Sequence, residues 1–194
     1  MALVLLFLTP GPVLVALFAR GLRGGFSATW PLTLGVAIGD LAWSVTAVLT
    51  LNQLVGIHGD ILLWLKYVAV LVFFFMGMGL IFAKTETITA PSQLMRPGRL
   101  AGLFAGLLVI IGNPKAIFFY IGILPGFFDV GTLQILDIVI IGALSASVPL
   151  AGNLGLALAL DRVSHLLASP HLRRRVNCIT GIVLILVGAG IFLG

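Results

Sequence analysis

Long apolar runs separated by short polar connections make up most of this chain. Six runs approach or exceed the roughly 20 apolar residues that a helix needs to cross a bilayer core. They are residues 1–19, 26–51, 61–83, 100–124, 133–160 and 176–193. The pattern predicts an all-α membrane protein with six transmembrane helices, occupying residues 1–194 as a single transmembrane domain.

Proline interrupts the first and the fourth of these runs. The interruptions are Thr9-Pro10-Gly11-Pro12 and Asn113-Pro114-Lys115. In lipid every backbone N–H and C=O needs a partner inside the protein, so such breaks are tolerated mainly where the freed groups face protein, water or a ligand. Paired interruptions in matching segments are the sequence feature that points to the binding site of a transporter.

The two interruptions divide the chain into similar halves. Pro10 and Pro114 lie 104 residues apart (114 − 10), about half of the 194 residues. We expect a first half at 1–83, a cytoplasmic connection at 84–99 and a second half at 100–194. Because each half crosses the membrane three times, the halves enter from opposite sides, which predicts a 3+3 inverted repeat with Pro-broken first and fourth helices.

Composition supports a membrane location. Hydrophobic residues form 60% of the chain, charged residues 9%, and the mean hydropathy is +1.23, whereas soluble domains average about 25% charged residues. A cleaved signal peptide is a weaker interpretation of the first run, which has no basic side chain before Arg20 and contains the Pro-Gly-Pro break.

The basic residues are distributed by topology. Nine of the eleven lie in three alternate connections: Arg20 and Arg23; Lys84, Arg96 and Arg99; Arg162, Arg173, Arg174 and Arg175. The other connections, 52–60 and 125–132, contain none. By the positive-inside rule these connections are cytoplasmic and both termini are periplasmic or extracellular. The high pI of about 10.2 therefore indicates orientation in a membrane and not a nucleic-acid partner.

Two charged residues stand out inside the apolar runs, where charge is costly and usually functional, whereas Lys66 and Asp137 lie nearer the ends of their runs. Asp40 lies near the centre of the second run, and Lys115 follows the Asn113-Pro114 break. Asp40 could carry a proton or bind a substrate ammonium, while Lys115 suits a substrate carboxylate. Alternatively the two side chains pair and cancel each other's desolvation. A buried pair that opens for substrate would satisfy both interpretations.

Polar and breaking residues nearby complete the candidate site. Thr9 and Asn113 could repair the open backbone or donate to substrate, and Asn153 could be the second-half counterpart of Asp40. The residues expected to shape the site are Pro10, Gly11, Pro12, Gly39 and Pro114. The sequence contains no cofactor motif and no cluster with metal-ligand spacing.

These motifs are also the basis of a family resemblance. The run from Leu8 to Pro12, the Gly39-Asp40 pair and the run from Gly112 to Ala116 resemble the lysine exporter and homoserine/threonine exporter (LysE/RhtB) superfamily. The resemblance covers essentially the whole chain. It implies export of amino acids or close derivatives, driven by the proton motive force, by a homo-oligomer. It also implies functional roles for the motif residues named above.

Two other functions stay open at this stage. One is export of another small solute such as a metal ion, although the apolar runs offer few hard-oxygen or thiolate ligands. The other is an intramembrane lipid-modifying enzyme, for which Asp161, Arg162 and His165 form a weak candidate set. The exporter interpretation is favoured, and it predicts a non-enzyme whose partners are an amino acid, protons and lipid.

Overall fold

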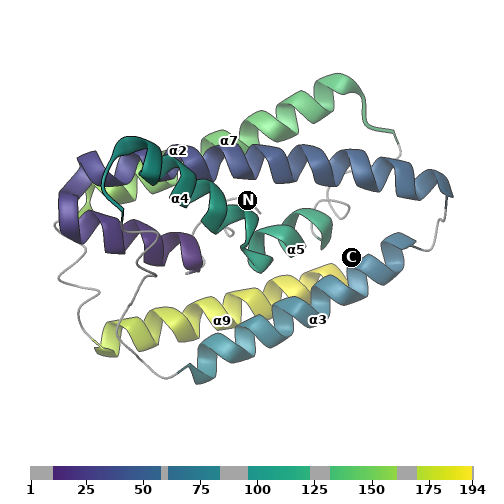
Figure 1. Ribbon diagram of the computed structural model, residues 1–194. Helices are drawn as coiled ribbons and strands as arrows, with labels where there is room; N and C mark the ends of the chain where they lie inside the picture. Colours follow the sequence, from purple (N-terminus) through teal and green to yellow (C-terminus); the bar gives the residue numbers. More distant parts are fainter. Residues whose placement is uncertain (1–10, 58–60, 84–95, 123–131, 161–169, 194) are drawn as a thin grey trace.

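A computed structural model describes residues 11–57, 61–83, 96–122, 132–160 and 170–193 (Figure 1). All regular secondary structure in these ranges is helical. The helices are α2 (Pro12–Ile57), α3 (Ile61–Phe82), α4 (Arg99–Ile111), α5 (Pro114–Gly122), α7 (Ile135–Leu158) and α9 (Pro170–Leu193). The prediction of an all-helical protein is confirmed for the described residues.

Helix α2 is broken at two glycines and folds back on itself. Gly25 has a φ of 59° and a ψ of −154°, a region that L side chains rarely adopt, and Gly24 is also non-helical. Figure 1 shows the short arm before the break running back alongside the long arm after it. Across the turn, Arg20 Nε donates to the Ala28 carbonyl at 2.9 Å. The two arms correspond to the first and second predicted segments.

The helices form two groups. Helix α2 packs extensively against α4 and α7, whereas α3 packs against α9 as a separate pair. Helix α5 contacts both α3 and α2, and it lies between the two groups (Figure 1). Helix α5 contacts α3 more extensively than it contacts α2.

Glycines permit the closest of these helix contacts. A Cβ atom added at Gly35 would clash with the Leu103 carbonyl oxygen, and one at Gly106 would clash with that of Leu32. Backbone approach of this kind allows dispersion forces to hold helices together where lipid provides no hydrophobic drive for association. Glycines thus act as packing residues at the α2–α4 interface.

Four described helices are long and apolar enough to cross a membrane, and five if α4 and α5 count as one bent span. Helices α4 and α5 meet at 55° at the Asn113-Pro114 position. The third and fifth predicted segments agree with α3 and α7 within two residues, but α9 begins at Pro170 and not at residue 176. The six crossings and the inverted repeat stay predictions.

Several polar side chains are buried with the apolar core of the bundle, and many large apolar side chains face outward. The buried polar and charged residues are Arg20, Thr29, Thr33, Asp40, Ser44, Asn113, Lys115, Ser145, Asn153 and Thr180. Outward-facing residues include Trp64 and Phe75 of α3, each more than 60% exposed. An apolar exterior around buried polar groups is the arrangement expected of helices surrounded by lipid.

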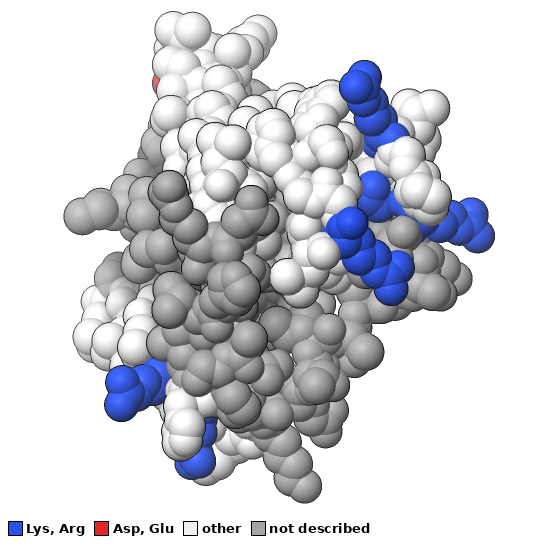
Figure 2. Space-filling view, turned by 90° about the vertical axis from the view of Figure 1, so that its left-hand side faces the viewer, with Lys and Arg blue, Asp and Glu red and all other residues white. Residues whose placement is uncertain are grey.

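Basic residues lie in two groups at the end of the bundle that Figure 2 faces. The α2 break, the start of α4 and the start of α9 all lie at this end in Figure 1. Arg23 and Arg99 lie beside the first two of these features, and Arg174 and Arg175 lie in the first turns of α9. Arg20 is different, because its side chain is buried and not presented to solvent as its predicted place in a connection suggested.

Candidate functional site

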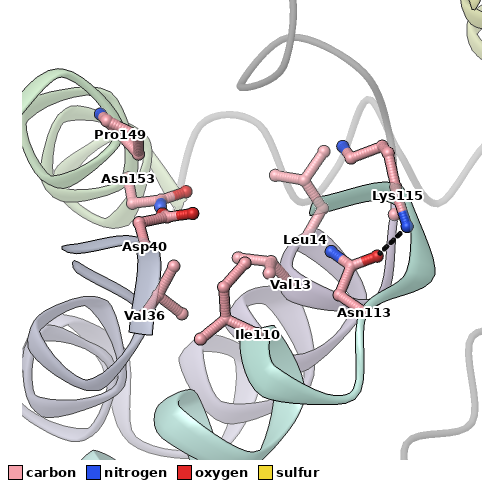
Figure 3. A pocket seen from close by; sticks show the side chains of 10 residues that line it. Val13, Leu14, Val36, Asp40, Ile110, Asn113, Lys115, Pro149 and Asn153 are labelled. Atoms are coloured by element: carbon pink, nitrogen blue, oxygen red, sulfur yellow. Dashed lines mark hydrogen bonds between the residues drawn. The ribbon is translucent and has the colours of Figure 1, made fainter. Parts of the chain in front are cut away.

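A cavity lies where the short arm of α2, the middle of its long arm, the α4–α5 junction and α7 converge (Figure 3). Its lining consists of Gly11, Val13, Leu14, Val36, Asp40, Ile110, Asn113, Lys115, Pro149 and Asn153. The structure therefore brings together five of the predicted site residues, namely Gly11, Asp40, Asn113, Lys115 and Asn153. Thr9 and Pro10 lie outside the described residues.

The remaining predicted residues adjoin the cavity through the backbone. Pro12 begins α2 and Pro114 begins α5. Proline suits a first helical position because its ring presets φ and the missing N–H would have no partner there. Gly39 precedes Asp40 and packs against Ile110, whose side chain occupies the space that a Cβ atom would need. Each of these residues thus shapes the walls and not the polar lining.

Asp40 lies on the long arm of α2 and is 2% exposed. Its carboxylate Oδ1 accepts a hydrogen bond from the Tyr120 hydroxyl at 3.1 Å. Tyr120 is fully buried on α5, and Ser145 of α7 lies beside the same hydroxyl. This hydrogen bond partly replaces the hydration that the carboxylate loses on burial.

Tyr120 is a site residue that the sequence reasoning missed. It is one of only two tyrosines in the chain and lies six residues after Pro114. A buried tyrosine hydroxyl usually requires a hydrogen-bond partner, so a tyrosine within an apolar run close to the break was a usable signal. The structure identifies that partner as Asp40.

Asn113 organises the junction between α4 and α5. Its backbone carbonyl accepts hydrogen bonds from Ala116 and Ile117, at 3.0 and 3.2 Å. Its side-chain Oδ1 accepts from the Lys115 backbone N–H at 3.1 Å. Asn113 therefore acts as the N-cap of α5, with Pro114 following it. Of the two predicted roles for Asn113, backbone repair is the one that these contacts display.

Lys115 lies in the first turn of α5 and is 6% exposed. Figure 3 shows it on the opposite side of the cavity from Asp40. A buried ammonium and a buried carboxylate on one cavity form a dipolar lining that suits a molecule carrying both charges. Such charges are costly at membrane depth and are retained mainly where they serve a substrate or ion pathway.

Helix α7 contributes Pro149 and Asn153, which lie one turn apart on its buried face. Figure 3 shows the Asn153 side chain next to Asp40. Pro149 has no N–H to offer to the Ser145 carbonyl one turn earlier, which opens the helical hydrogen bonding close to the cavity. The predicted counterpart of Asp40 in the second half thus lies in the same site.

The cavity is small in this conformation. The volume that the centres of water molecules could occupy is about 30 Å³, and one water molecule needs about 10–15 Å³ by this measure. Even the smallest amino acid has five non-hydrogen atoms and needs more space. Admission of such a solute therefore requires the lining helices to separate.

The described residues contain no group of three or more His, Cys, Asp or Glu side chains that could hold a metal ion. The lining of the cavity includes one carboxylate and two side-chain amides, from Asp40, Asn113 and Asn153. The weak enzymatic set of Asp161, Arg162 and His165 lies outside the described residues.

Comparison with known proteins gives consistent matches over the chain. A family model described as LysE type translocator matches residues 4–193. Uncharacterized membrane protein slr1627 of Synechocystis sp. is 31% identical over 188 residues, which is 96% of this chain and 90% of that protein. Uncharacterized membrane protein PA4757 of Pseudomonas aeruginosa is 24% identical over 135 residues, covering 68% and 62% of the two chains. No solved structure matches.

Proposed function

Because the chain belongs to the LysE type translocator family, we propose that it exports amino acids or close derivatives across the bacterial inner membrane, using the proton motive force. The observation that carries this proposal is the cavity that Asp40 and Lys115 line from opposite sides. The family supports transport of a small solute, and the two charges specify what kind of solute fits.

An amino acid carries an ammonium and a carboxylate on the same carbon atom. In the proposed complex the substrate ammonium binds Asp40, with Asn153 beside it, and the substrate carboxylate binds Lys115. Each buried charge of the protein then has an opposite charge from the substrate, which lowers the desolvation cost of both. A solute with a single charge would leave either Asp40 or Lys115 without this compensation.

Asp40 is also the proposed proton carrier. It is the carboxylate of the described cavity lining, so substrate and proton would compete for the same oxygen atoms. Release of substrate on the outside frees the carboxylate, a proton binds there, and its delivery to the cytoplasm resets the carrier. Competition at one group is sufficient to couple outward movement of substrate to inward movement of protons.

The proposed orientation places the basic end of Figure 2 in the cytoplasm. Asp40 and Lys115 would then lie at the depth where helix α4 ends and α5 begins. A site near mid-membrane, next to discontinuous helices, supports alternating access, in which the site opens to one side at a time. A homo-oligomer, as the family resemblance implies, is compatible with this scheme but is not needed for it.

Export is tested in cells that are loaded with dipeptides, which internal peptidases hydrolyse to free amino acids. Amino acids that appear outside are measured for cells expressing the wild type, Asp40→Asn or Asp137→Asn. Asp137 lies in the first turn of α7, away from the cavity lining, and is the control for loss of a carboxylate. All variants are quantified in isolated membranes.

We expect export by the wild type and the Asp137→Asn control, and loss of export with Asp40→Asn. Wild-type export rates for Asp40→Asn would remove the proposed proton role. Failure of the wild type to export any amino acid, despite confirmed membrane insertion, would refute amino acids as cargo. Inhibition of efflux by divalent cations but not by amino acids would instead favour the metal-ion alternative.

A further inference from the structure

The lining of the cavity restricts the side chain of the substrate as well as its backbone. Among its ten residues, Asp40 is the single anion and Lys115 the single cation. In the proposed function both are occupied by the charges that every amino acid carries. The lining therefore has no further opposite charge for an acidic or basic substrate side chain.

A charged side chain in this cavity would be desolvated without an ionic partner. Burial of an uncompensated charge is among the largest penalties in protein energetics. The amides of Asn113 and Asn153 can offer hydrogen bonds but no opposite charge. Lysine, arginine, glutamate and aspartate are thus disfavoured by the charges of the described site.

The rest of the wall is aliphatic. Val13 and Leu14 come from the short arm of α2, Val36 from its long arm, and Ile110 from the end of α4. Figure 3 shows Val13, Leu14 and Ile110 between Asp40 and Lys115, and Val36 beside Asp40. A zwitterion held at both charged ends would place its side chain against them.

We infer that the substrate is an amino acid with an uncharged aliphatic side chain, recognised by Val13, Leu14, Val36 and Ile110. This inference rests on the proposed function of the same site. An aliphatic wall discriminates by size, by about 10–200-fold per methylene group, and burial of an unpaired charge costs more still. The expected substrates therefore come from alanine, valine, leucine and isoleucine, with the best fit exported fastest, and charged amino acids are excluded most strongly.

The first test compares a panel of dipeptides in cells expressing the wild type. Homodipeptides of alanine, valine, leucine, lysine, arginine and glutamate are supplied separately, and internal and external concentrations of each free amino acid are measured. We expect export rates per internal concentration to be at least about 10-fold higher for the aliphatic amino acids.

The outcomes separate the two proposals. Export of lysine, arginine or glutamate at rates equal to those of the aliphatic amino acids would overturn the inference and leave the proposed function intact. Export of no amino acid would refute both. Aliphatic selectivity would support both.

The second test assigns the selectivity to the wall. Ile110 is 3% exposed and lines the cavity, whereas its neighbour Ile111 on the same helix is 44% exposed. Ile110→Ala removes part of the wall and enlarges the cavity. The ratio of the leucine export rate to the alanine export rate should therefore rise on the order of 10-fold. Ile111→Ala removes the same atoms from the outer face and should leave the ratio unchanged.

The ratio of the export rates of two substrates, measured on one preparation of cells, does not depend on how much protein reaches the membrane. Ile110→Val provides a milder variant in case Ile110→Ala does not accumulate, and a smaller shift in the same direction is expected. An unchanged leucine-to-alanine ratio in the Ile110 variants, or an equal shift in Ile111→Ala, would overturn the assignment of the wall.

Discussion

The contact between α3 and α9 depends on two glycines that face each other. A Cβ atom added at Gly77 would lie 2.6 Å from the Gly181 carbonyl oxygen, and one added at Gly181 would lie 2.5 Å from the Gly77 carbonyl oxygen. Both obstacles are backbone atoms within helices and cannot rotate away. Substitution of Gly77 by alanine should therefore force the helices apart.

The required displacement follows from these distances. Ordinary van der Waals contact of a Cβ atom begins at about 3.4 Å, so the helices must separate by roughly 0.8 Å (3.4 − 2.6). Overpacking of this size typically costs about 1–3 kcal/mol, and a gap along the crossing forfeits further dispersion contacts. Because lipid supplies no compensating hydrophobic drive, the loss should be visible as lower stability of the folded bundle.

Gly79 and Gly190 provide matched controls on the same two helices. A Cβ atom at either position meets no atom of the described residues within 4 Å, so alanine should be neutral or should stabilise by up to about 1 kcal/mol through its higher helix propensity. The thermal midpoint of detergent-purified protein is measured for Gly77→Ala, Gly181→Ala and the two controls. Equal midpoints for Gly77→Ala and Gly79→Ala would refute the reasoning about this crossing.

Two further predictions concern buried polar side chains. Tyr120→Phe removes the hydrogen bond to Asp40, which for a charged acceptor is worth about 1.5–3 kcal/mol, so export should fall by about 10-fold or more. Tyr67→Phe, on the exposed face of α3, should have no effect, and equal rates for the two variants would contradict the prediction. Arg20 donates to three backbone carbonyls, and Arg20→Lys should lower the thermal midpoint because an ammonium cannot reproduce the planar fork of donors. Arg23→Lys, on the same arm but exposed, is its control, and an equal midpoint for the two would show that the fork is dispensable.

Much of the candidate site could be predicted because charge and proline are rare in apolar runs. Asp40, Asn113, Lys115 and Asn153 all line one cavity, although they come from α2, the α4–α5 junction and α7. Each is polar at a depth where a polar group needs a protein or ligand partner. That requirement can be read from a single sequence without knowing how the helices pack.

The partners of these groups could not be predicted in the same way. The contact between Tyr120 and Asp40 depends on the relative rotation of α5 and α2, which local hydrophobic patterning does not determine. Arg20 looked like a topological charge, but the Gly24-Gly25 turn folds its arm back so that its guanidinium reaches Arg96 and Gly98 carbonyls. Hydropathy also misplaced the start of α9, because it detects the apolar part of a helix and not its basic first turns.

The irregular features of the chain are linked by one physical requirement, which is a polar cavity inside an apolar bundle. Gly39 allows Ile110 of α4 to pack directly against the α2 turn that carries Asp40, and this approach brings the α4–α5 junction to the cavity. The junction interrupts the α4 backbone, and the Asn113 cap satisfies groups that the interruption exposes. Helix α5 then begins at the cavity, which Lys115 lines, and it carries Tyr120, whose hydroxyl donates to Asp40. The break is therefore the feature that allows a short chain to place a cation and a hydrogen-bond donor around one buried carboxylate.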